Sequence, residues 1–283
     1  MHVQPQPGIE MPGYWQAPLR GISGAKALIR ARIILLRSGW RRTKNAIGVS
    51  EDQEGWLSHS VRITRMLLLG HRGSRCSAPV PENTFAAFDL ALQHGCDGFE
   101  FDVRLTRDGV PVICHDANFK RLPISRTPAS RLPDLPTLEA VLKRYRTRGF
   151  LDIELKVAGI EPRLLQLLAR RRPKKGFVIS SFLPSVLSKL RRLDTRIPLG
   201  LICENTRQLQ LWRDLPIDTV IAHQSLVTRS LLKDVHTAGK TLLAWTVNRK
   251  ANMVRLADMG VDGIISDRTD LLAQTLAPRA SHL

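Results

Sequence analysis

Histidine and acidic side chains stand at the ends of short apolar runs in this chain of 283 residues. The run "LLLG" (67–70) is followed at once by His71 and Arg72. Ionisable residues alternate with apolar ones in two further runs, "GFEFDV" and "LDIELK": Glu100, Asp102, Asp152, Glu154 and Lys156. Side chains alternate along a β-strand, so the members of each set point to one side. Several carboxylates are therefore expected to face one pocket.

Such a group of carboxylates indicates a metal site. Neighbouring negative charges raise one another's pKa values unless a cation neutralises them. A divalent ion with oxygen ligands is the natural occupant, and Mg²⁺ or Ca²⁺ suits these donors better than zinc.

Two histidines are expected beside that cation. His71 follows the first run, and His115 lies near the end of "RDGVPVICHD" (107–116). Imidazoles around one phosphorus atom can donate and accept a proton, which is worth about 10²–10⁴-fold in rate. Arg72 and Lys156 supply a planar guanidinium and an ammonium for phosphate oxygens.

These groups must be positioned by strands whose ends meet at one edge. From Met66 onward, short β-rich runs alternate with helical patterns, which is typical of repeated βαβ units. Strands are predicted over residues 66–70, 97–103, 150–156, 177–181, 197–202, 218–222, 241–247 and 261–266. Helices are predicted over residues 84–94, 137–147, 161–171, 184–192, 205–213, 228–238, 249–259 and 269–276.

Eight parallel strands, each followed by a helix, predict an α/β fold, the TIM (β/α)8 barrel, for residues 66–283. Active sites of this fold lie at the carboxyl ends of the strands, where all the residues named above fall. Trp245 ends the seventh strand and favours the pocket over the core. Two roles stay open: Asp152 is a ligand or a hydrogen-bonding neighbour, and Asp267 faces the pocket or fixes the last loop.

A hairpin interrupts the alternation after the second strand. Asp108-Gly109 is a turn signal, and the chain runs back toward His115-Asp116 before a proline-containing loop over 117–136. Thr137 is expected to cap the next helix. For the segment 82–84 (Glu-Asn-Thr), capping of the first helix and direct contact with a ligand are equally open.

The motifs together resemble the glycerophosphodiester phosphodiesterase family of the phospholipase C-like phosphodiesterase superfamily. They are, in order, "GHRG", "PENTFAAF", "GFEFDVRLTRDGVPVICHD", "PTLEAVL", "DIELK", "AWTVN" and "GVDGIISD". The resemblance covers residues 66–276 and none of 1–65. It implies metal-dependent hydrolysis of glycerophosphodiesters to sn-glycerol 3-phosphate and an alcohol.

The resemblance also implies roles for individual residues. His71 and His115 would form the acid–base pair, with His71 the base in the first step. In that step a substrate hydroxyl attacks phosphorus to give a cyclic phosphate. The remaining roles fall to Glu100, Asp102 and Glu154 as ligands of Mg²⁺ or Ca²⁺, Arg72 and Lys156 as phosphate-binding groups, and Trp245 as a wall of the glycerol pocket.

The chain departs from the family pattern after His115-Asp116, where an insertion of several dozen residues is reduced to about twenty. A more open mouth favours an alternative substrate class, bulkier phosphodiesters such as lysophospholipids, with lysophospholipase D activity. A second alternative is a basic barrel without catalysis that binds anionic ligands.

Charge and cysteine content limit the other classes. The formal charge is +18, which favours anionic partners, but aromatic residues make up only 5% and do not alternate with basic ones, which argues against nucleic acid. The four cysteines show no paired spacing and are expected as free thiols. No apolar run is long enough to cross a membrane, and together these features favour a cytoplasmic protein. The oligomeric state is left open.

Residues 1–65 form a basic extension with three interpretations. It is disordered, or it carries a basic amphipathic helix over 24–42 that associates weakly with an anionic membrane surface, or translation starts at Met66.

Overall fold

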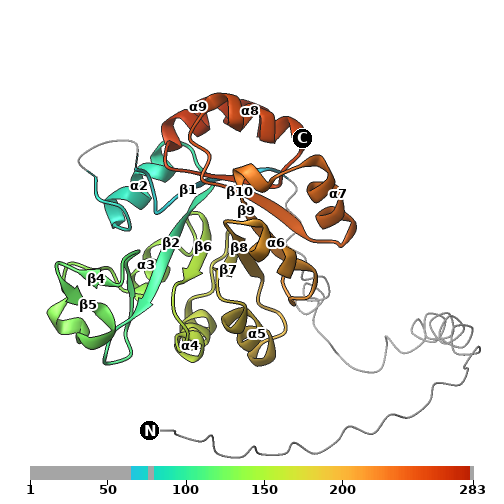
Figure 1. Cartoon of the computed structure of the whole chain (residues 1–283). Coiled ribbons are helices and arrows are strands. Elements are labelled where there is room, and N and C mark those ends of the chain that lie inside the picture. Colours follow the sequence, from blue (N-terminus) through green and yellow to red (C-terminus); the bar gives the residue numbers. More distant parts are fainter. Residues whose placement is uncertain (1–64, 76–79, 281–283) are drawn as a thin grey trace, which may run out of the picture. The chain divides into compact units, whose positions relative to one another are not determined.

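A closed barrel of eight parallel strands forms the centre of the computed structural model, which describes residues 65–75 and 80–280 (Figure 1). Strand β1 pairs with both β2 and β11, and this double pairing closes the barrel. The strands are β1 (Leu67–Gly70), β2 (Gly98–Leu105), β6 (Phe150–Leu155), β7 (Phe177–Ser181), β8 (Leu199–Cys203), β9 (Thr219–His223), β10 (Thr241–Trp245) and β11 (Gly263–Ser266). The predicted TIM barrel is confirmed.

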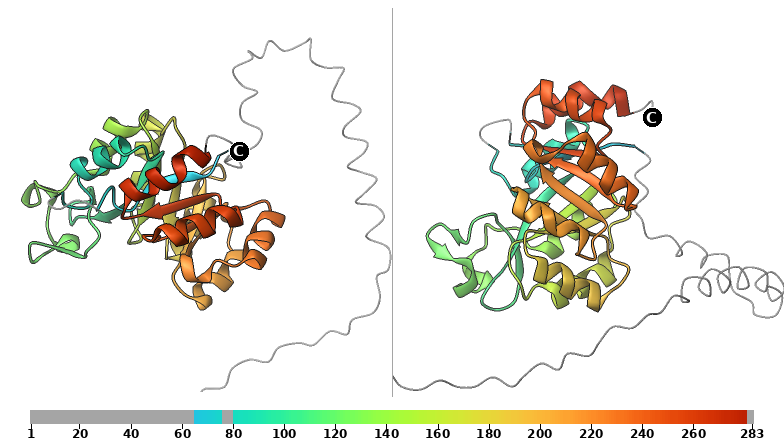
Figure 2. Two further views of the ribbon diagram at one scale, coloured as in Figure 1. Left: turned by 90° about the horizontal axis from the view of Figure 1, so that it is seen from above. Right: turned by 45° about the vertical axis from the view of Figure 1, so that its right-hand side comes forward.

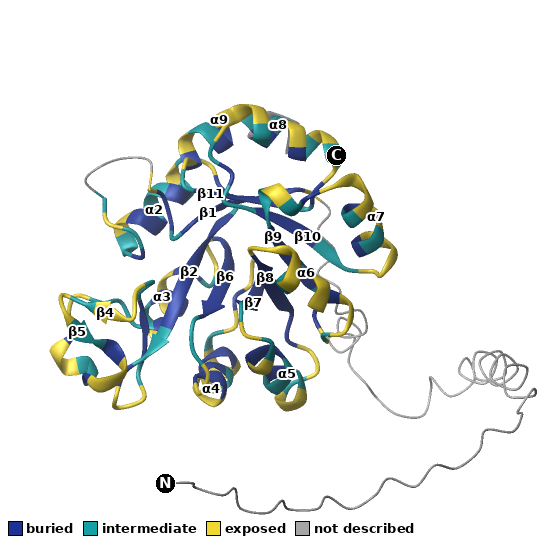
Figure 3. Cartoon of the chain, viewed as in Figure 1, coloured by how far each residue is buried: buried dark blue, intermediate teal, exposed yellow. Residues whose placement is uncertain are grey.

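Helices follow the strands and surround the barrel (Figure 2). They are α2 (Phe85–Gln93), α3 (Leu138–Tyr145), α4 (Glu161–Arg171), α5 (Pro184–Leu193), α6 (Thr206–Gln210), α7 (Arg229–Thr237), α8 (Lys250–Met259) and α9 (Thr269–Ala280). The sixth is shorter than predicted, because the α-helix gives way to a 3-10 turn over Leu211–Arg213 that buries Trp212. The strands are buried, and so are the sides of the helices that face them. The outer sides of the helices are exposed (Figure 3).

Two apolar clusters hold the barrel together. One fills the space between strands and helices, and the other lies inside the barrel, with one buried side chain from each strand except β2: Leu69, Phe150, Val178, Ile202, Ile221, Leu243 and Ile265. On β2 the corresponding position is Gly98, whose register neighbour is Phe150. A methyl group there would meet the Phe150 carbonyl oxygen at 1.9 Å. The small residue therefore permits the close approach of β2 and β6.

Gly98→Ala is expected to lower the free energy of unfolding by more than about 2 kcal/mol, because the new methyl group meets backbone that cannot turn aside. Gly200→Ala is the matched control, since the nearest atoms to its methyl group are in side chains and not in the backbone: Ile221 Cδ1 at 3.0 Å and Val178 Cγ2 at 3.2 Å. Urea unfolding followed by circular dichroism measures both losses. Equal losses in the two variants would contradict this account of the β2–β6 contact.

The predicted hairpin after the second strand is present. Strand β3 (Pro111–Ile113) runs antiparallel to β2, and Gly109 takes a φ of 77° in the turn. The next segment was predicted as a loop, yet it contains a small hairpin of β4 (Asn118–Phe119) and β5 (Leu122–Pro123). A separate cluster of Val112, Ile124 and Leu132 packs beneath it. We call residues 117–136 the mouth lobe; in Figure 1 its two strands lie outside the ring of helices.

Several predictions from the sequence fall on residues outside the described ranges, namely the extension with its helix over 24–42 and Cys76. The boundary between residues 65 and 66 also stays a prediction. Cys96, Cys114 and Cys203 form no disulfide. Among the described residues, no helix combines the length and the apolar character needed to cross a membrane.

Candidate functional site

A cavity of about 290 Å³ opens at the carboxyl ends of the barrel strands. Seven of the eight predicted site residues line it: His71, Arg72, Glu100, His115, Glu154, Lys156 and Trp245. The eighth, Asp102, has a side chain only 1% exposed and contacts Arg72 and Lys156. The barrel thus brings together residues that lie up to 174 positions apart in the chain.

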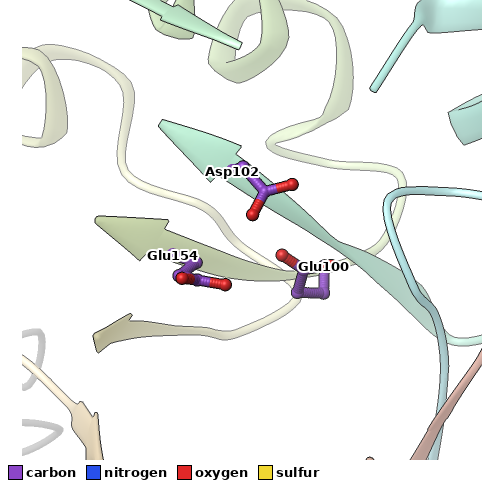
Figure 4. Close-up of side chains that lie close together, drawn as sticks. All are labelled: Glu100, Asp102 and Glu154. Atoms are coloured by element: carbon purple, nitrogen blue, oxygen red, sulfur yellow. The ribbon is translucent and has the colours of Figure 1, made fainter. Parts of the chain in front are cut away.

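Strand register places the carboxylates side by side. Strands β2 and β6 run parallel, with Glu100 beside Asp152 and Asp102 beside Glu154. The carboxylates of Glu100, Asp102 and Glu154 turn toward one another (Figure 4), and one oxygen of each lies within 4.8 Å of the others. All three residues are buried, and the donors are all oxygen, which suits Mg²⁺ or Ca²⁺.

The hydrogen bonding of these carboxylates fits a cation site. Glu100 Oε1 is buried without a hydrogen-bond partner. Asp102 Oδ1 and Glu154 Oε1 face only the Lys156 ammonium, at 3.3 and 2.7 Å. Buried carboxylate oxygens normally accept hydrogen bonds. Because these oxygens accept none, they indicate a site for a further cation.

The pKa values reflect the same crowding. Burial raises the pKa of Glu100 well above its usual range, and the charges of Asp102 and Glu154 raise it further. Burial and the Asp102 charge raise the pKa of Glu154 to about 7, although Lys156 opposes them. For Asp102, burial acts upward but is outweighed by Lys156, Arg72 and a hydrogen bond from Asn83, so its pKa is lowered. Of the three carboxylates, Asp102 alone has a lowered pKa.

Asp152 lies next to this cluster as a hydrogen-bonding neighbour. Its Oδ1 accepts a hydrogen bond of 2.5 Å from Ser180 Oγ, and burial raises its pKa to about 7. It is absent from the group of three whose oxygens converge. Of the two roles open from the sequence, the geometry favours the neighbour.

The loop after β1 is held to the carboxylates by its backbone. Arg72 and Asn83 both have positive φ angles, 53° and 58°, which residues with side chains seldom adopt. The Arg72 N–H donates to Glu100 Oε2 at 2.9 Å, and the Asn83 side chain donates to Asp102 Oδ2 at 2.8 Å. The Asn83 N–H in turn donates to the Arg72 carbonyl at 3.0 Å. These bonds stabilise the strained conformation and orient two of the carboxylates.

The segment 82–84 contains the predicted helix cap. Thr84 caps α2, as its hydroxyl accepts a hydrogen bond from the Ala87 N–H. Glu82 pairs with the Arg72 guanidinium at 2.8 Å and with Arg75 at 2.9 Å, two contacts that the sequence did not predict. Direct contact of this segment with a ligand stays a prediction.

The two histidines occupy different surroundings. His71 is buried, and its Nδ1 lies 2.8 Å from Asp267 Oδ1 while its Nε2 lies 3.9 Å from Glu100 Oε2. Asp267, whose other oxygen accepts a hydrogen bond from Asn248, therefore fixes the imidazole orientation. His115 is more exposed; its Nδ1 lies 2.8 Å from Asp116, and its carbonyl accepts two hydrogen bonds from Arg104.

Trp245 lines the cavity, in agreement with its predicted place in the pocket. Its ring meets Phe182 edge-on at 5.6 Å and lies 6.4 Å from the His71 ring. The indole N–H donates to the Cys203 carbonyl at 3.3 Å. Sequence reasoning missed Phe182 and Glu204, which also line the cavity.

An eight-stranded barrel with clustered acids, two histidines, an arginine and a lysine at its mouth fits the class of phosphodiester-cleaving enzymes. The profile of the glycerophosphoryl diester phosphodiesterase family matches residues 71–145 and 150–271. The chain therefore belongs to this family and is an enzyme that hydrolyses phosphoric diesters. The resemblance found in the motifs is confirmed.

Individual relatives extend over most of the chain. YhdW of Bacillus subtilis strain 168, whose name assigns it provisionally to the glycerophosphodiester phosphodiesterases, is 32% identical over 73% of this chain and 96% of its own length. A glycerophosphodiester phosphodiesterase of Caldanaerobacter subterraneus is 30% identical over 74% of this chain and 96% of its own. A phosphodiesterase from Oleispira antarctica, solved in complex with the product sn-glycerol 3-phosphate, shares 27% identity with a TM-score of 0.67, over 75% of this chain and 97% of its own.

The Asp267–His71 contact predicts a loss of stability in acid. Burial would raise the pKa of Asp267, but His71, Asn248 and Arg75 outweigh it and lower that pKa to about 2. A carboxylate with a lowered pKa stabilises the fold fully above its ordinary pKa of 3.8, and this stabilisation disappears as the pH falls toward 2.

Asp267→Asn should therefore lower the unfolding free energy at pH 7 by at most about 2 kcal/mol, and the difference from the natural chain should shrink below pH 4. Denaturant unfolding at pH 7, 4 and 3 tests this. The exposed Asp214 provides the control Asp214→Asn, which should change little at any of these pH values. A difference for Asp267→Asn that is independent of pH would refute the ionic origin of the stabilisation.

Proposed function

We propose that this enzyme hydrolyses glycerophosphodiesters to sn-glycerol 3-phosphate and an alcohol, that it requires Mg²⁺ or Ca²⁺, and that His71 and His115 transfer the protons. The observation that carries the proposal is the convergence of three buried carboxylates within 4.8 Å, beside His71 and beneath Lys156. The relatives named for this activity and the product bound to the Oleispira enzyme support the choice of substrate.

Glu100, Asp102 and Glu154 would hold the cation through their carboxylate oxygens. When bound, the cation offsets negative charge on the phosphate oxygens and orients the attacking hydroxyl. The chain prepares the site by fixing two of the ligands before binding, through the Arg72 N–H on Glu100 and the Asn83 amide on Asp102. Arg72 and Lys156 then bind the remaining phosphate oxygens.

His71 is placed to act as the base of the first step. Asp267 accepts the hydrogen bond of its Nδ1–H, so that Nε2 faces the cavity without a proton. It takes the proton from the attacking hydroxyl, and the resulting imidazolium is stabilised by Asp267. His115, at the more open side of the mouth, gives a proton to the departing alcohol. Water then opens the cyclic phosphate with the two roles reversed.

The glycerol unit lies against Trp245 and the apolar floor of the cavity. The Trp245 ring is fixed by Phe182 and by its bond to the Cys203 carbonyl. A rigid aromatic wall orients a small three-carbon unit without loss of side-chain entropy.

The first test is release of sn-glycerol 3-phosphate from glycerophosphocholine and glycerophosphoethanolamine with Mg²⁺, with Ca²⁺ and with EDTA. His71→Gln should lower kcat by about 10²–10⁴-fold because the base is lost. His236→Gln is the matched control, since His236 also contacts a carboxylate, Asp262, at 2.8 Å but lies outside the cavity. Turnover in EDTA, or full activity of His71→Gln, would reject the proposed mechanism.

The cation site is tested without turnover. Glu100→Gln should weaken Mg²⁺ and Ca²⁺ binding in calorimetry by at least about 100-fold, because one carboxylate ligand is lost. The same substitution should raise the Tm of the metal-free protein, because it removes a buried charge that burial and its neighbours disfavour.

Glu139→Gln, on the exposed face of α3, is the control for cation binding and should leave it unchanged. If Glu100→Gln binds the cations as tightly as the natural chain, Glu100 is not a ligand.

A further inference from the structure

The cavity has two unlike sides. The strands β1, β2 and β6 supply its charged side, from His71 round to Lys156. The strands β7 to β11 supply an apolar side made of Phe182, Ile202, Ile221, Trp245 and Ile265. One residue breaks this pattern: Glu204, directly after β8, lines the apolar side.

Glu204 is fixed in place while its carboxylate is free. Ile202 faces the barrel interior, so Glu204, two positions further on, faces the same side. Its N–H donates to Gln208 Oε1 at 2.7 Å, and Gln208 belongs to the capping box of α6, which pins this backbone. Among the described residues, no hydrogen bond or ion pair engages the Glu204 carboxylate.

A free carboxylate is unusual in this domain. Most acidic side chains here are paired with arginine or lysine, for example Asp89 with Arg144 and Asp234 with Arg213. An ionised carboxylate only accepts hydrogen bonds, so at the edge of a substrate cavity it selects a cation or a group with O–H donors.

The surroundings favour hydroxyl donors over a cation. The Lys156 ammonium already lies over the Phe182 ring, 5.6 Å from its centroid, so a cation of this chain already occupies that aromatic face. Neutral hydroxyls on a short carbon chain fit an apolar floor with one acceptor at its rim.

We propose that Glu204 determines specificity by accepting a hydrogen bond from the terminal hydroxyl of the glycerol unit, the one that does not attack phosphorus. This inference rests on the proposed function, because it assumes that the glycerol lies against Trp245. An acyl group on the terminal hydroxyl removes a donor and brings an ester oxygen toward the carboxylate. The enzyme therefore prefers deacylated glycerophosphodiesters to lysophospholipids, although its mouth lobe is short.

Product binding measured by calorimetry tests the inference without turnover. The probes are sn-glycerol 3-phosphate and n-propyl phosphate, which has the same carbon chain and no hydroxyl, each with Mg²⁺ and again with Ca²⁺. Glu204→Gln should weaken binding of glycerol 3-phosphate by about tenfold or more, since a charged acceptor is lost. Binding of n-propyl phosphate should stay equal or become slightly tighter, because a negative charge near the phosphate has gone.

Asp214→Asn, which removes an exposed carboxylate outside the cavity, should change neither affinity. Equal weakening of both ligands in Glu204→Gln, or a natural chain without preference for glycerol 3-phosphate, would overturn the inference.

Kinetics with Glu204→Gln show whether Glu204 contacts the glycerol unit or the alcohol unit of the substrate. The values of kcat/KM should fall alike for glycerophosphocholine, glycerophosphoethanolamine and glycerophosphoglycerol, and should not fall for lysophosphatidylcholine. A loss confined to the choline and ethanolamine diesters would assign Glu204 to the alcohol and reject the inference. If the enzyme hydrolyses none of these diesters but still binds glycerol 3-phosphate more tightly than n-propyl phosphate, the proposed function is wrong and the glycerol subsite is still supported.

Discussion

The burial of several carboxylates at one end of the barrel is the constraint on which the mouth of this enzyme depends. Parallel pairing of β2 with β6 sets Asp102 beside Glu154, and the barrel wall excludes water from both. Such an arrangement is costly in free energy without positive charge. Lys156 and Arg72 supply part of that charge, and among the described residues Glu100 Oε1 still lacks a hydrogen-bond donor. The fold thus holds mutually repelling carboxylates that a bound cation would stabilise.

The loop after β1 explains how the cluster keeps its geometry. Two residues of this loop, Arg72 and Asn83, adopt positive φ angles. Both donate hydrogen bonds to the carboxylates, Arg72 to Glu100 and Asn83 to Asp102. The same bonds therefore stabilise the strained loop backbone and orient two of the carboxylates.

The features of the fold and the site that depend on local patterns could be predicted from the sequence. Alternation along β2 and β6 placed the acids, and regular spacing of strands and helices predicted the barrel. Contacts between distant residues could not be read in the same way. Asp267 lies 196 positions from His71, and its role stayed open until closure of β1 against β11 brought them together. Phe182 and Glu204 were missed because single residues after strands carry no local signal. The β4–β5 hairpin lacked the glycine turn that marks the earlier one.

The difference between the two histidines bears on the direction of the reaction. The His71 side chain is 11% exposed and fixed by Asp267, whereas that of His115 is 35% exposed beside the mouth lobe. A base that must remove a proton from a held substrate benefits from a fixed, dry position. A group that protonates a departing alcohol benefits from a position at the exit. If His115 serves the departing alcohol as proposed, the alcohol lies on the more exposed side of the site. In that arrangement the selection of substrate would rest on the other side, where Trp245 forms an aromatic wall and Glu204 presents its carboxylate.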